Sequence, residues 1–151
     1  MPARRKDQPA GHEQLGQLLH VVAKSWRHEL DRRLKPLGLT RTKWLALILM
    51  TRSGGGITQR SLAEKMEIGQ PAMVALLDRL EKDELIRRNP MPGDRRASSL
   101  ELTPAGKKLI SKIEVVAHQL REEILAGFSV RELQTAGDVL ARMKAKLEAF
   151  P

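Results

Sequence analysis

This chain of 151 residues contains no cysteine. It therefore has no disulfide, no cysteine-ligated metal site and no thiol redox sensor. Aromatic residues make up only 3% of the sequence, so Leu, Ile, Val, Ala and Met must fill the core. The hydrophobic fraction of 41% is enough for a modest core. We expect one domain, extended by helices that serve oligomerisation.

Long apolar runs are absent as well. The longest, Trp44 to Met50, is far too short to span a bilayer. The chain starts with polar and basic residues, and no apolar stretch of signal-peptide type follows them. We therefore expect a cytoplasmic protein with no membrane partner, and a disordered basic arm over residues 1–12.

Acidic residues are too few to balance the basic ones. The net charge is +9 and the sequence pI is about 10.4. Such an excess favours an anionic partner, and on charge alone nucleic acid, an acidic membrane and an acidic protein all remain possible.

The motifs of common enzymes are missing too. The sequence has no His-Glu-x-x-His, no Gly-x-Ser-x-Gly and no nucleotide-binding fingerprint. His20 and His28 fall on roughly one face of a predicted helix, without a third ligand at metal-site spacing. The glycine-rich segment at 53–56 is not followed by the Lys-Ser/Thr of a phosphate-binding loop. We expect no enzymatic activity, no cofactor and no metal.

Helical periodicity is what the sequence does contain. The first predicted helix ends near Lys35-Pro36, and its apolar positions are Leu15, Leu18, Leu19, Val22, Trp26, Leu30 and Leu34. Thr40 is the expected N-cap of a second helix that continues to Met50.

Two short helices follow, joined by a tight turn. Thr58 caps the first, and Glu67-Ile68-Gly69 forms the turn. Pro71 is expected at the first position of the second helix, which has Val74, Leu77 and Leu80 on one face. This pattern is typical of a helix-turn-helix.

A basic hairpin comes next, from Arg87 to Thr103. Ile86 begins its first strand, and Leu100 and Leu102 alternate with polar residues as a half-buried strand requires. The tip contains Pro-Gly-Asp, a common turn sequence. A helix-turn-helix followed by a basic hairpin indicates a winged helix that binds DNA.

Two helices end the chain. Thr103-Pro104 starts a long helix that Gly127 ends, and Ser129 with Glu132 forms a capping box for the last helix. The apolar stripes of the terminal helices are too long for the small winged helix to cover. We favour a homodimer that buries them, the alternative being one helix that folds back on another within the chain.

The DNA-contact prediction begins with the second short helix. Gln70 matches adenine, and Ala72 or Met73 matches a thymine methyl. The alternatives are that Met73 belongs to the core and that Gln70 is a solvated cap. The full predicted set outside the hairpin is Thr58, Gln59, Arg60, Gln70, Pro71, Ala72, Met73 and Arg79.

The hairpin tip supplies the second part of the prediction. Arg95 or Arg96 is expected to enter the minor groove, with Asp94 orienting one guanidinium. The alternative is an exposed turn rich in solvated charges. Arg87 and Arg88, at the base, are interpreted as phosphate contacts or solvated residues. The two tryptophans, Trp26 and Trp44, belong either to the core or to the aromatic wall of a small-molecule pocket.

Five stretches of this sequence resemble the MarR family, and within it the SlyA-like branch. They are Asp31–Trp44, Gln70-Pro71 with Leu77–Glu81, Asp94–Ala97, Leu102–Gly106 and Ile124–Gly127. The resemblance covers the chain from about Leu15 onward.

The resemblance implies a mainly α protein with a small β-hairpin wing. Residues 13–151 would form a single MarR-like domain, with a winged helix-turn-helix at 40–103 and dimerisation helices at 13–36 and 104–151. It also implies a dimeric transcription regulator, repressor or activator, in the bacterial nucleoid-associated pool. Its partner would be double-stranded, pseudo-palindromic, A/T-rich DNA.

Relatives often release DNA when a small aromatic or carboxylate ligand binds. The positions that match the border of their pocket are Lys24, Trp26, Trp44 and Ile48. Asp94 and Arg96 match the Asp-x-Arg pair at the tip of the family's wing, and the helix that begins at Pro71 matches its recognition helix.

Two departures concern DNA-facing charge. SlyA-like proteins tend to carry Arg where this chain has Ala75 and Lys where it has Ser98. The operator preference of relatives is therefore not transferred here. The alternative function is a ligand-independent DNA-binding protein that counters nucleoid-protein silencing at A/T-rich promoters, and a third is a winged helix that contacts protein or RNA.

Overall fold

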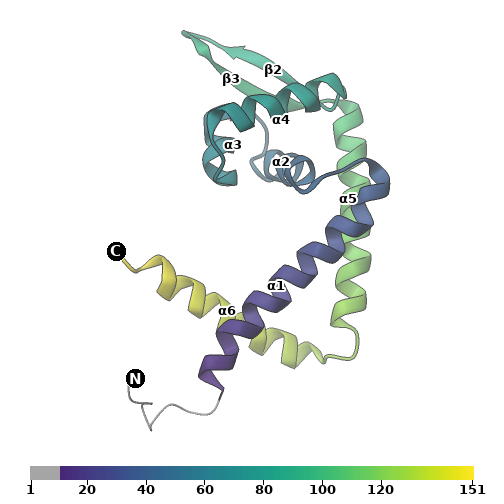
Figure 1. Ribbon diagram of the computed structural model, residues 1–151, viewed down its shortest axis with the longest axis vertical. Helices are drawn as coiled ribbons and strands as arrows, with labels where there is room; N and C mark the ends of the chain where they lie inside the picture. Colours follow the sequence, from purple (N-terminus) through teal and green to yellow (C-terminus); the bar gives the residue numbers. More distant parts are fainter. Residues whose placement is uncertain (1–10) are drawn as a thin grey trace. The chain divides into compact units, whose positions relative to one another are not determined.

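The computed structural model of this protein describes residues 11–151, except for the side chains of Glu13 and residues 94–96. The chain has two compact units: the first ends at Ala117, and the second comprises His118–Pro151. Helices dominate, and one small three-stranded sheet lies in the first unit (Figure 1). This confirms the predicted mainly α class with a small β wing. Most of the predicted basic arm lies outside the described residues.

The first two helices follow the expected pattern. Helix α1, His12–Leu34, continues into a 3-10 turn, Lys35–Leu37, which contains the proline predicted to end it. Gly38 then takes a left-handed conformation with φ 74°, which suits a residue without a side chain. Helix α2, Arg41–Arg52, is capped by Thr40, whose side-chain oxygen accepts a hydrogen bond from the Lys43 amide.

The helix-turn-helix consists of α3, Gln59–Met66, and α4, Gln70–Lys82. Thr58 caps α3 as predicted, because its Oγ1 accepts from the Ser61 amide at 3.1 Å. Glu67 makes the turn in the left-handed region, with φ 55°. Pro71 occupies the second position of α4 rather than the first, since Gln70 already has helical geometry; a missing N–H is harmless at either position.

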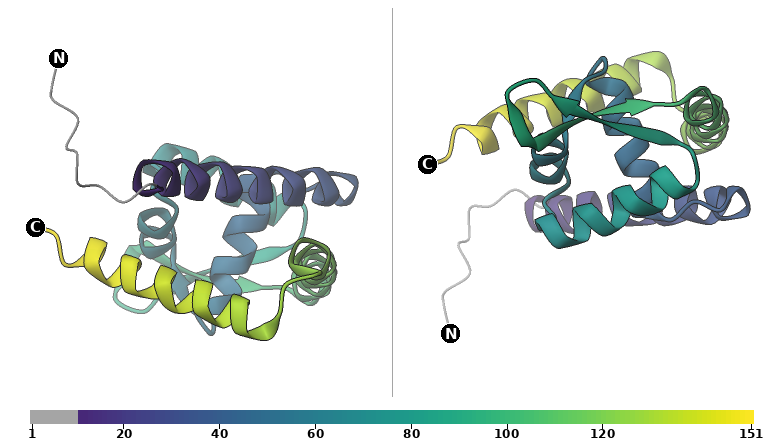
Figure 2. Two further views of the ribbon diagram at one scale, coloured as in Figure 1. Left: turned by 90° about the horizontal axis from the view of Figure 1, so that it is seen from below. Right: turned by 90° about the horizontal axis from the view of Figure 1, so that it is seen from above.

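The sheet has the strand order β1-β3-β2, with both pairs antiparallel. Strands β2, Ile86–Met91, and β3, Asp94–Leu102, form the predicted hairpin, which is twisted (Figure 2). Strand β1, Ile57–Thr58, pairs with Leu100 and Ser99 of β3. Sequence reasoning missed β1 because two residues are too few to show alternation.

A single apolar core lies in the first unit. Leu47, Leu62 and Leu77 are fully buried, one from each of α2, α3 and α4, and Leu100 of β3 adds the sheet. Apolar residues of α1 and of the first turns of α5 complete this core. The winged-helix region, residues 40–103, is thus packed around side chains that belong to the same chain.

Helix α5, Pro104–Leu125, begins at a closely packed corner. The Thr103 hydroxyl donates to the Glu84 carbonyl at 2.6 Å and accepts from the Gly106 amide at 3.0 Å. A Cβ at Gly106 would overlap the backbone carbonyl oxygen of Leu85. Glycine at this position therefore lets α5 approach the chain segment between α4 and β2.

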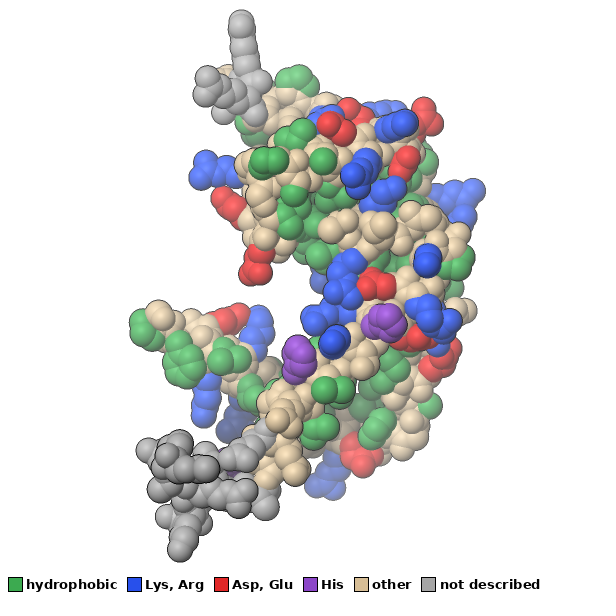
Figure 3. Space-filling model, in the orientation of Figure 1, with side chains coloured by type: hydrophobic (Ala, Val, Ile, Leu, Met, Phe, Trp, Pro, Cys, Tyr) green, Lys and Arg blue, Asp and Glu red, His purple; other side chains and the backbone are tan. Residues whose placement is uncertain are grey.

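The second unit contains the end of α5 and helix α6, Val130–Glu148. Both halves of the predicted capping box are present, with Ser129 and Glu132 bonded reciprocally. No residue of α6 is buried, and apolar side chains are visible on its surface (Figure 3). Large exposed apolar residues of this unit are Phe128, Val130, Val139, Leu140, Leu147 and Phe150.

Within residues 11–151, no helix is both long and apolar enough to cross a membrane.

Candidate DNA-binding interface

Helix α4 has one buried face and one exposed face. Met73, Leu76, Leu77 and Leu80 are buried, at the spacing of a helix that packs on one side. Ala72, Ala75 and Arg79 are exposed and recur at three- and four-residue intervals, so they form a stripe on the other side. The two alanines have short side chains, which leaves the backbone of α4 open to close approach by a partner.

Two sequence predictions for α4 are wrong. Met73 was a candidate for contact with a thymine methyl, but its side chain has no exposed surface, so the alternative assignment to the core is the right one. The periodicity also puts Val74 on one face with Leu77 and Leu80; those two are buried, but 39% of Val74 is exposed. The error was in phase: the apolar run Met73–Leu77 contains a helical stripe that begins one residue before Val74.

The first turn of α4 is open to solvent. Gln70, Pro71 and Ala72 are all exposed, as DNA contact requires. The Gln59 side-chain amide, at the start of α3, donates to the Gln70 Oε1 at 3.4 Å. The N-terminal ends of α3 and α4 therefore meet at two polar side chains, each with donors and acceptors left for a base or a phosphate.

The start of α3 has fewer free groups than the sequence indicated. The Thr58 oxygen is engaged as the helix cap, and Thr58 is only half exposed. The Arg60 Nε lies 3.2 Å from Glu64 Oε1, but the Arg60 side chain is 85% exposed. An ion pair this exposed is weak, so Arg60 is available to a phosphate.

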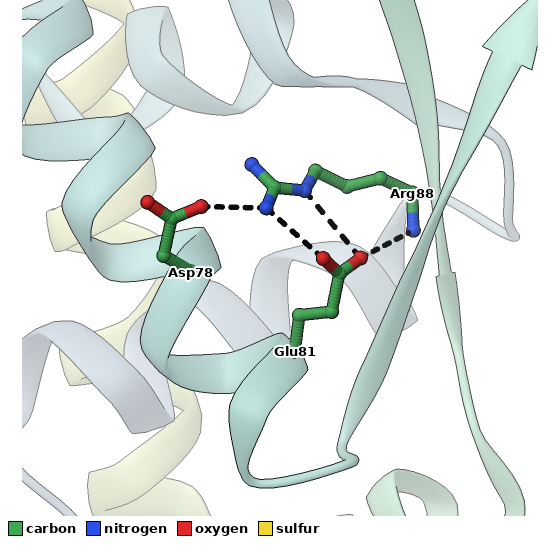
Figure 4. A network of polar contacts seen from close by, with 3 residues as sticks. All are labelled: Asp78, Glu81 and Arg88. Carbon is green, nitrogen blue, oxygen red and sulfur yellow. Dashed lines mark hydrogen bonds and ion pairs between the residues drawn. The ribbon is translucent and has the colours of Figure 1, made fainter.

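Arg88 is held by two carboxylates of α4 (Figure 4). Its Nη2 lies 2.5 Å from Asp78 Oδ1 and 3.0 Å from Glu81 Oε1. Its Nε and its backbone amide donate to Glu81 Oε2 at 3.4 and 3.3 Å. The hydrogen bonds with Glu81 raise the pKa of Arg88, and in turn lower the pKa of Glu81.

The guanidinium of Arg88 is therefore engaged within the protein rather than solvated, whereas its predicted phosphate contact is tested by none of the described contacts. The neighbouring Arg87 is exposed and has no ion pair among the contacts of the described residues. The sequence does contain a signal for this network: two acidic residues three apart near the end of a helix, then an arginine on the following strand.

The hairpin tip is described only as backbone. Asp94 begins β3 and is paired with Met91, after a register shift between Pro90 and Met91. The side chains of Asp94, Arg95 and Arg96 lie outside the described part of the chain, so their roles in the minor groove stay predictions.

The four predicted ligand-pocket residues are in different environments. Trp44 is buried, and its Nε1 donates to Asp31 Oδ1 at 2.8 Å. Trp26 and Ile48 are half-buried, and Lys24 is exposed. For Trp44 this favours the core interpretation. Burial raises the pKa of Asp31, but hydrogen bonds from Arg41 and Trp44 outweigh it, so the pKa is lowered overall and the buried indole stays paired with a carboxylate.

A groove of about 570 Å³ lies elsewhere in the first unit, and none of those four residues lines it. Its walls are the end of α2, the glycines after it, strand β3 and the first turns of α5. Among the residues that the structure describes, no three His, Asp or Glu side chains are placed to hold a metal ion.

A family model described as the MarR family matches residues 37–97, which include the helix-turn-helix and most of the hairpin. The transcriptional regulator PA3341, of known crystal structure, is 40% identical, with 90% of this chain and 99% of that chain covered and a TM-score of 0.78. The chain belongs to the MarR family.

MarR from E. coli in its apo form is 26% identical to this chain, with a TM-score of 0.74 over 85% of this chain and 96% of that one. A MarR variant from E. coli complexed with operator DNA is 25% identical, with a TM-score of 0.72 over 90% of this chain and 99% of that one. These matches confirm a winged-helix, DNA-binding transcription regulator. The family consists of regulators rather than enzymes.

Proposed function

We propose that this MarR-family protein is a homodimer that binds a specific, pseudo-palindromic operator. The observation that carries the proposal is the exposed N-terminal part of α4, with the basic hairpin directly after it, in a chain of net charge +9. The related E. coli MarR variant solved with operator DNA supports it. The family resemblance implies a duplex of the A/T-rich class, while the operator sequence itself is not taken from relatives.

In this proposal α4 is the recognition helix in the major groove. Gln70 reads adenine, and the small side chains of Ala72 and Ala75 bring the helix close enough to touch thymine methyl groups. Arg79 lies on the same exposed stripe and contacts a phosphate. Pro71 adds to the contact surface of the first turn of α4. The start of α3, with Thr58, Gln59 and Arg60, lies against the sugar-phosphate backbone of the DNA.

The wing reads the minor groove. We assign Arg96 to the groove itself, Asp94 to the orientation of its guanidinium, and Arg95 to the DNA backbone. Because Ala75 leaves α4 without a basic group that SlyA-like proteins tend to have in the recognition helix, we assign the wing arginines a larger share of the affinity here.

The dimer is formed by the terminal helices, residues 13–36 and 104–151, of the proposed single MarR-like domain. Exposed apolar side chains on α1 and α6, such as Val22 and Leu140, are 53% and 47% exposed and need a second surface. A two-fold dimer places two recognition helices about one helical turn of DNA, roughly 34 Å, apart.

The operator-binding proposal is tested by selecting duplexes from a random library and footprinting the best site. We expect a symmetric footprint and an affinity that falls steeply with salt. Replacing Arg96 by Ala should cost about 1–3 kcal/mol of binding free energy at the selected site. Asp94→Ala should also weaken binding, although it removes a negative charge; a gain in affinity would contradict the orienting role.

We also propose that a small aromatic carboxylate releases the DNA, as the SlyA-like resemblance implies. The ligand would lie near Lys24, Trp26, Trp44 and Ile48 and favour a dimer whose recognition helices are wrongly spaced. Titrating salicylate against the protein–operator complex tests this. If saturating salicylate leaves the affinity unchanged, the ligand-independent alternative, an antagonist of nucleoid-protein silencing, gains support.

A further inference from the structure

Strand β2 and helix α4 are joined by more than the turn between them. Arg88, the third residue of β2, reaches back to Asp78 and Glu81, one turn apart near the end of α4 (Figure 4). The guanidinium bonds to both carboxylates, and Glu81 also accepts from the Arg88 backbone amide. Both the side chain and the main chain of β2 are thus tied to one helix.

The contact lies part-way along β2, so a change there tilts the part of the hairpin beyond it. The three residue steps from Arg88 to Met91 extend about 10 Å at 3.3–3.4 Å per residue, so a tilt of a few degrees at this contact moves the end of β2 by about half an ångström. Below the contact, Ile86 is buried in the core. Above it, Asn89 and Pro90 are exposed, so Arg88 is the outermost described residue of β2 that is tied to α4.

We propose that Arg88 is a positioning residue that sets the angle between the wing and the recognition helix, and that it does not bind phosphate. This rests on the proposed function, in which α4 and the wing must enter neighbouring grooves at once. The Arg88 side chain is 26% exposed, and those of Asp78 and Glu81 are 57% and 42% exposed. The contact is stronger than a single surface pair because one planar fork meets two carboxylates.

Charge balance also argues against a phosphate role. Two carboxylates face one guanidinium, so the cluster has a net charge of −1. If Arg88 turned to a phosphate, it would leave Asp78 and Glu81 unpaired beside the DNA backbone. A polyanion therefore favours keeping the network closed.

The first test needs no DNA. Residual dipolar couplings of backbone amides report how β2 and β3 are oriented against α4. In the wild type and in the control Arg87→Gln, both elements should fit one alignment tensor. In Arg88→Gln, the hairpin couplings should be scaled down or fit a different orientation. An Arg88→Gln hairpin that keeps the wild-type orientation and amplitude overturns the proposal.

The second test uses the selected operator. The two roles considered for Arg88 predict opposite changes in operator affinity when Glu81 is replaced. Glu81→Gln raises the net charge by one, so if Arg88 bound phosphate, freeing it would tighten binding. We expect the reverse, with affinity lowered about fivefold, the upper end of what an exposed ion pair contributes. Tighter binding by Glu81→Gln overturns the proposal. Arg87→Gln should weaken all duplexes alike and reduce the salt slope.

The conservative replacement Arg88→Lys gives the third measurement. Lysine keeps the charge but cannot bridge two carboxylates and present Nε as well. If Arg88 contacts a phosphate, Arg88→Lys should largely restore operator binding. If Arg88 positions the wing, footprinting of Arg88→Lys should show weaker protection of the flanking minor groove than wild type, with the major-groove footprint unchanged. Full rescue by lysine overturns the proposal.

These outcomes separate the two proposals. If the wild type selects no duplex, the proposed operator binding fails, and the dipolar couplings still decide whether Arg88 orients the hairpin. If the wild type binds and Arg88→Gln has wild-type couplings, only the role of Arg88 is wrong.

Discussion

The winged-helix region and helix α6 differ in how far their apolar side chains are buried. In the winged-helix region Leu47, Leu62 and Leu77 have no exposed surface, whereas α6 buries no residue and Leu147 is 64% exposed. The helices of the winged-helix region and helix α6 each have a clear apolar stripe. The two regions differ in whether other residues of the same chain cover that stripe.

This difference separates two kinds of stability. The winged-helix region is covered by its own chain, so its stability should be independent of protein concentration. A helix whose stripe has no cover in its own chain depends on a second surface, and its stability should rise with concentration if that surface belongs to another copy. The predictions below test this contrast.

The largest expected effect comes from the core. Leu77→Ala should lower the free energy of unfolding by about 3 kcal/mol, because it leaves a cavity among fully buried neighbours. Chemical denaturation at two protein concentrations would show the same loss at both. A loss below about 1 kcal/mol would mean that the winged-helix core is not packed as described.

Two helical glycines provide a matched pair: Gly106, at the start of α5, packs against the end of the winged-helix region, and Gly137 lies in α6. Gly106→Ala should destabilise by about 2 kcal/mol, since the new methyl group would overlap the Leu85 carbonyl oxygen. Gly137→Ala in α6 has open space around it and should stabilise by up to about 1 kcal/mol, as expected for an exposed helix. A thermal melt of each variant checks both signs. Destabilisation by Gly137→Ala would show that a partner covers that face closely.

The oligomeric role of α6 is tested by Leu140→Glu. Burying a leucine at an interface stabilises it by about 2 kcal/mol, so a charge there should raise the dimer dissociation constant at least tenfold. Arg142→Glu, on the other side of α6, is the control. Sedimentation velocity over a range of concentrations measures both. An unchanged dissociation constant for Leu140→Glu would remove α6 from the dimer interface.

The smallest effect is local to α1. Hydrogen bonds from Arg32 and Arg33 lower the pKa of Glu29 to about 2, below its ordinary 4.5. A carboxylate whose pKa is lowered by folding contributes stability above pH 4.5 and loses it as the pH falls toward 2. Glu29→Gln should therefore be less stable than wild type at pH 7, and the difference should vanish near pH 2. Thermal melts of wild type and Glu29→Gln between pH 7 and pH 2 check this trend, and a difference that persists at pH 2 would contradict it.

Local signals in the sequence were sufficient for most elements. Caps at Thr40, Thr58 and Ser129 and the proline after Leu34 placed helix ends to within one or two residues, because each acts on its own backbone neighbours. Strand β1 was missed because its pairing partner, Leu100, lies 43 residues away along the chain.

Side-chain roles were harder to predict than elements. Met73 and Val74 are adjacent apolar residues, and only the packing of α4 decides that Met73 is buried and Val74 exposed. Arg88 looked free because its two partners are seven and ten residues away, on another element. Contacts at such separations depend on how a helix and a strand meet, which periodicity does not contain.

By itself, the sequence determined the helix boundaries, the order of helices and hairpin in the winged helix, and the family. These follow from local backbone preferences and short motifs. Only the tertiary structure decided which side chains are paired or buried within the protein. It pairs Arg88 with Asp78 and Glu81, and it places Met73 in the core. The physical reason is that charge is a property of a residue, whereas its availability depends on neighbours that folding brings together.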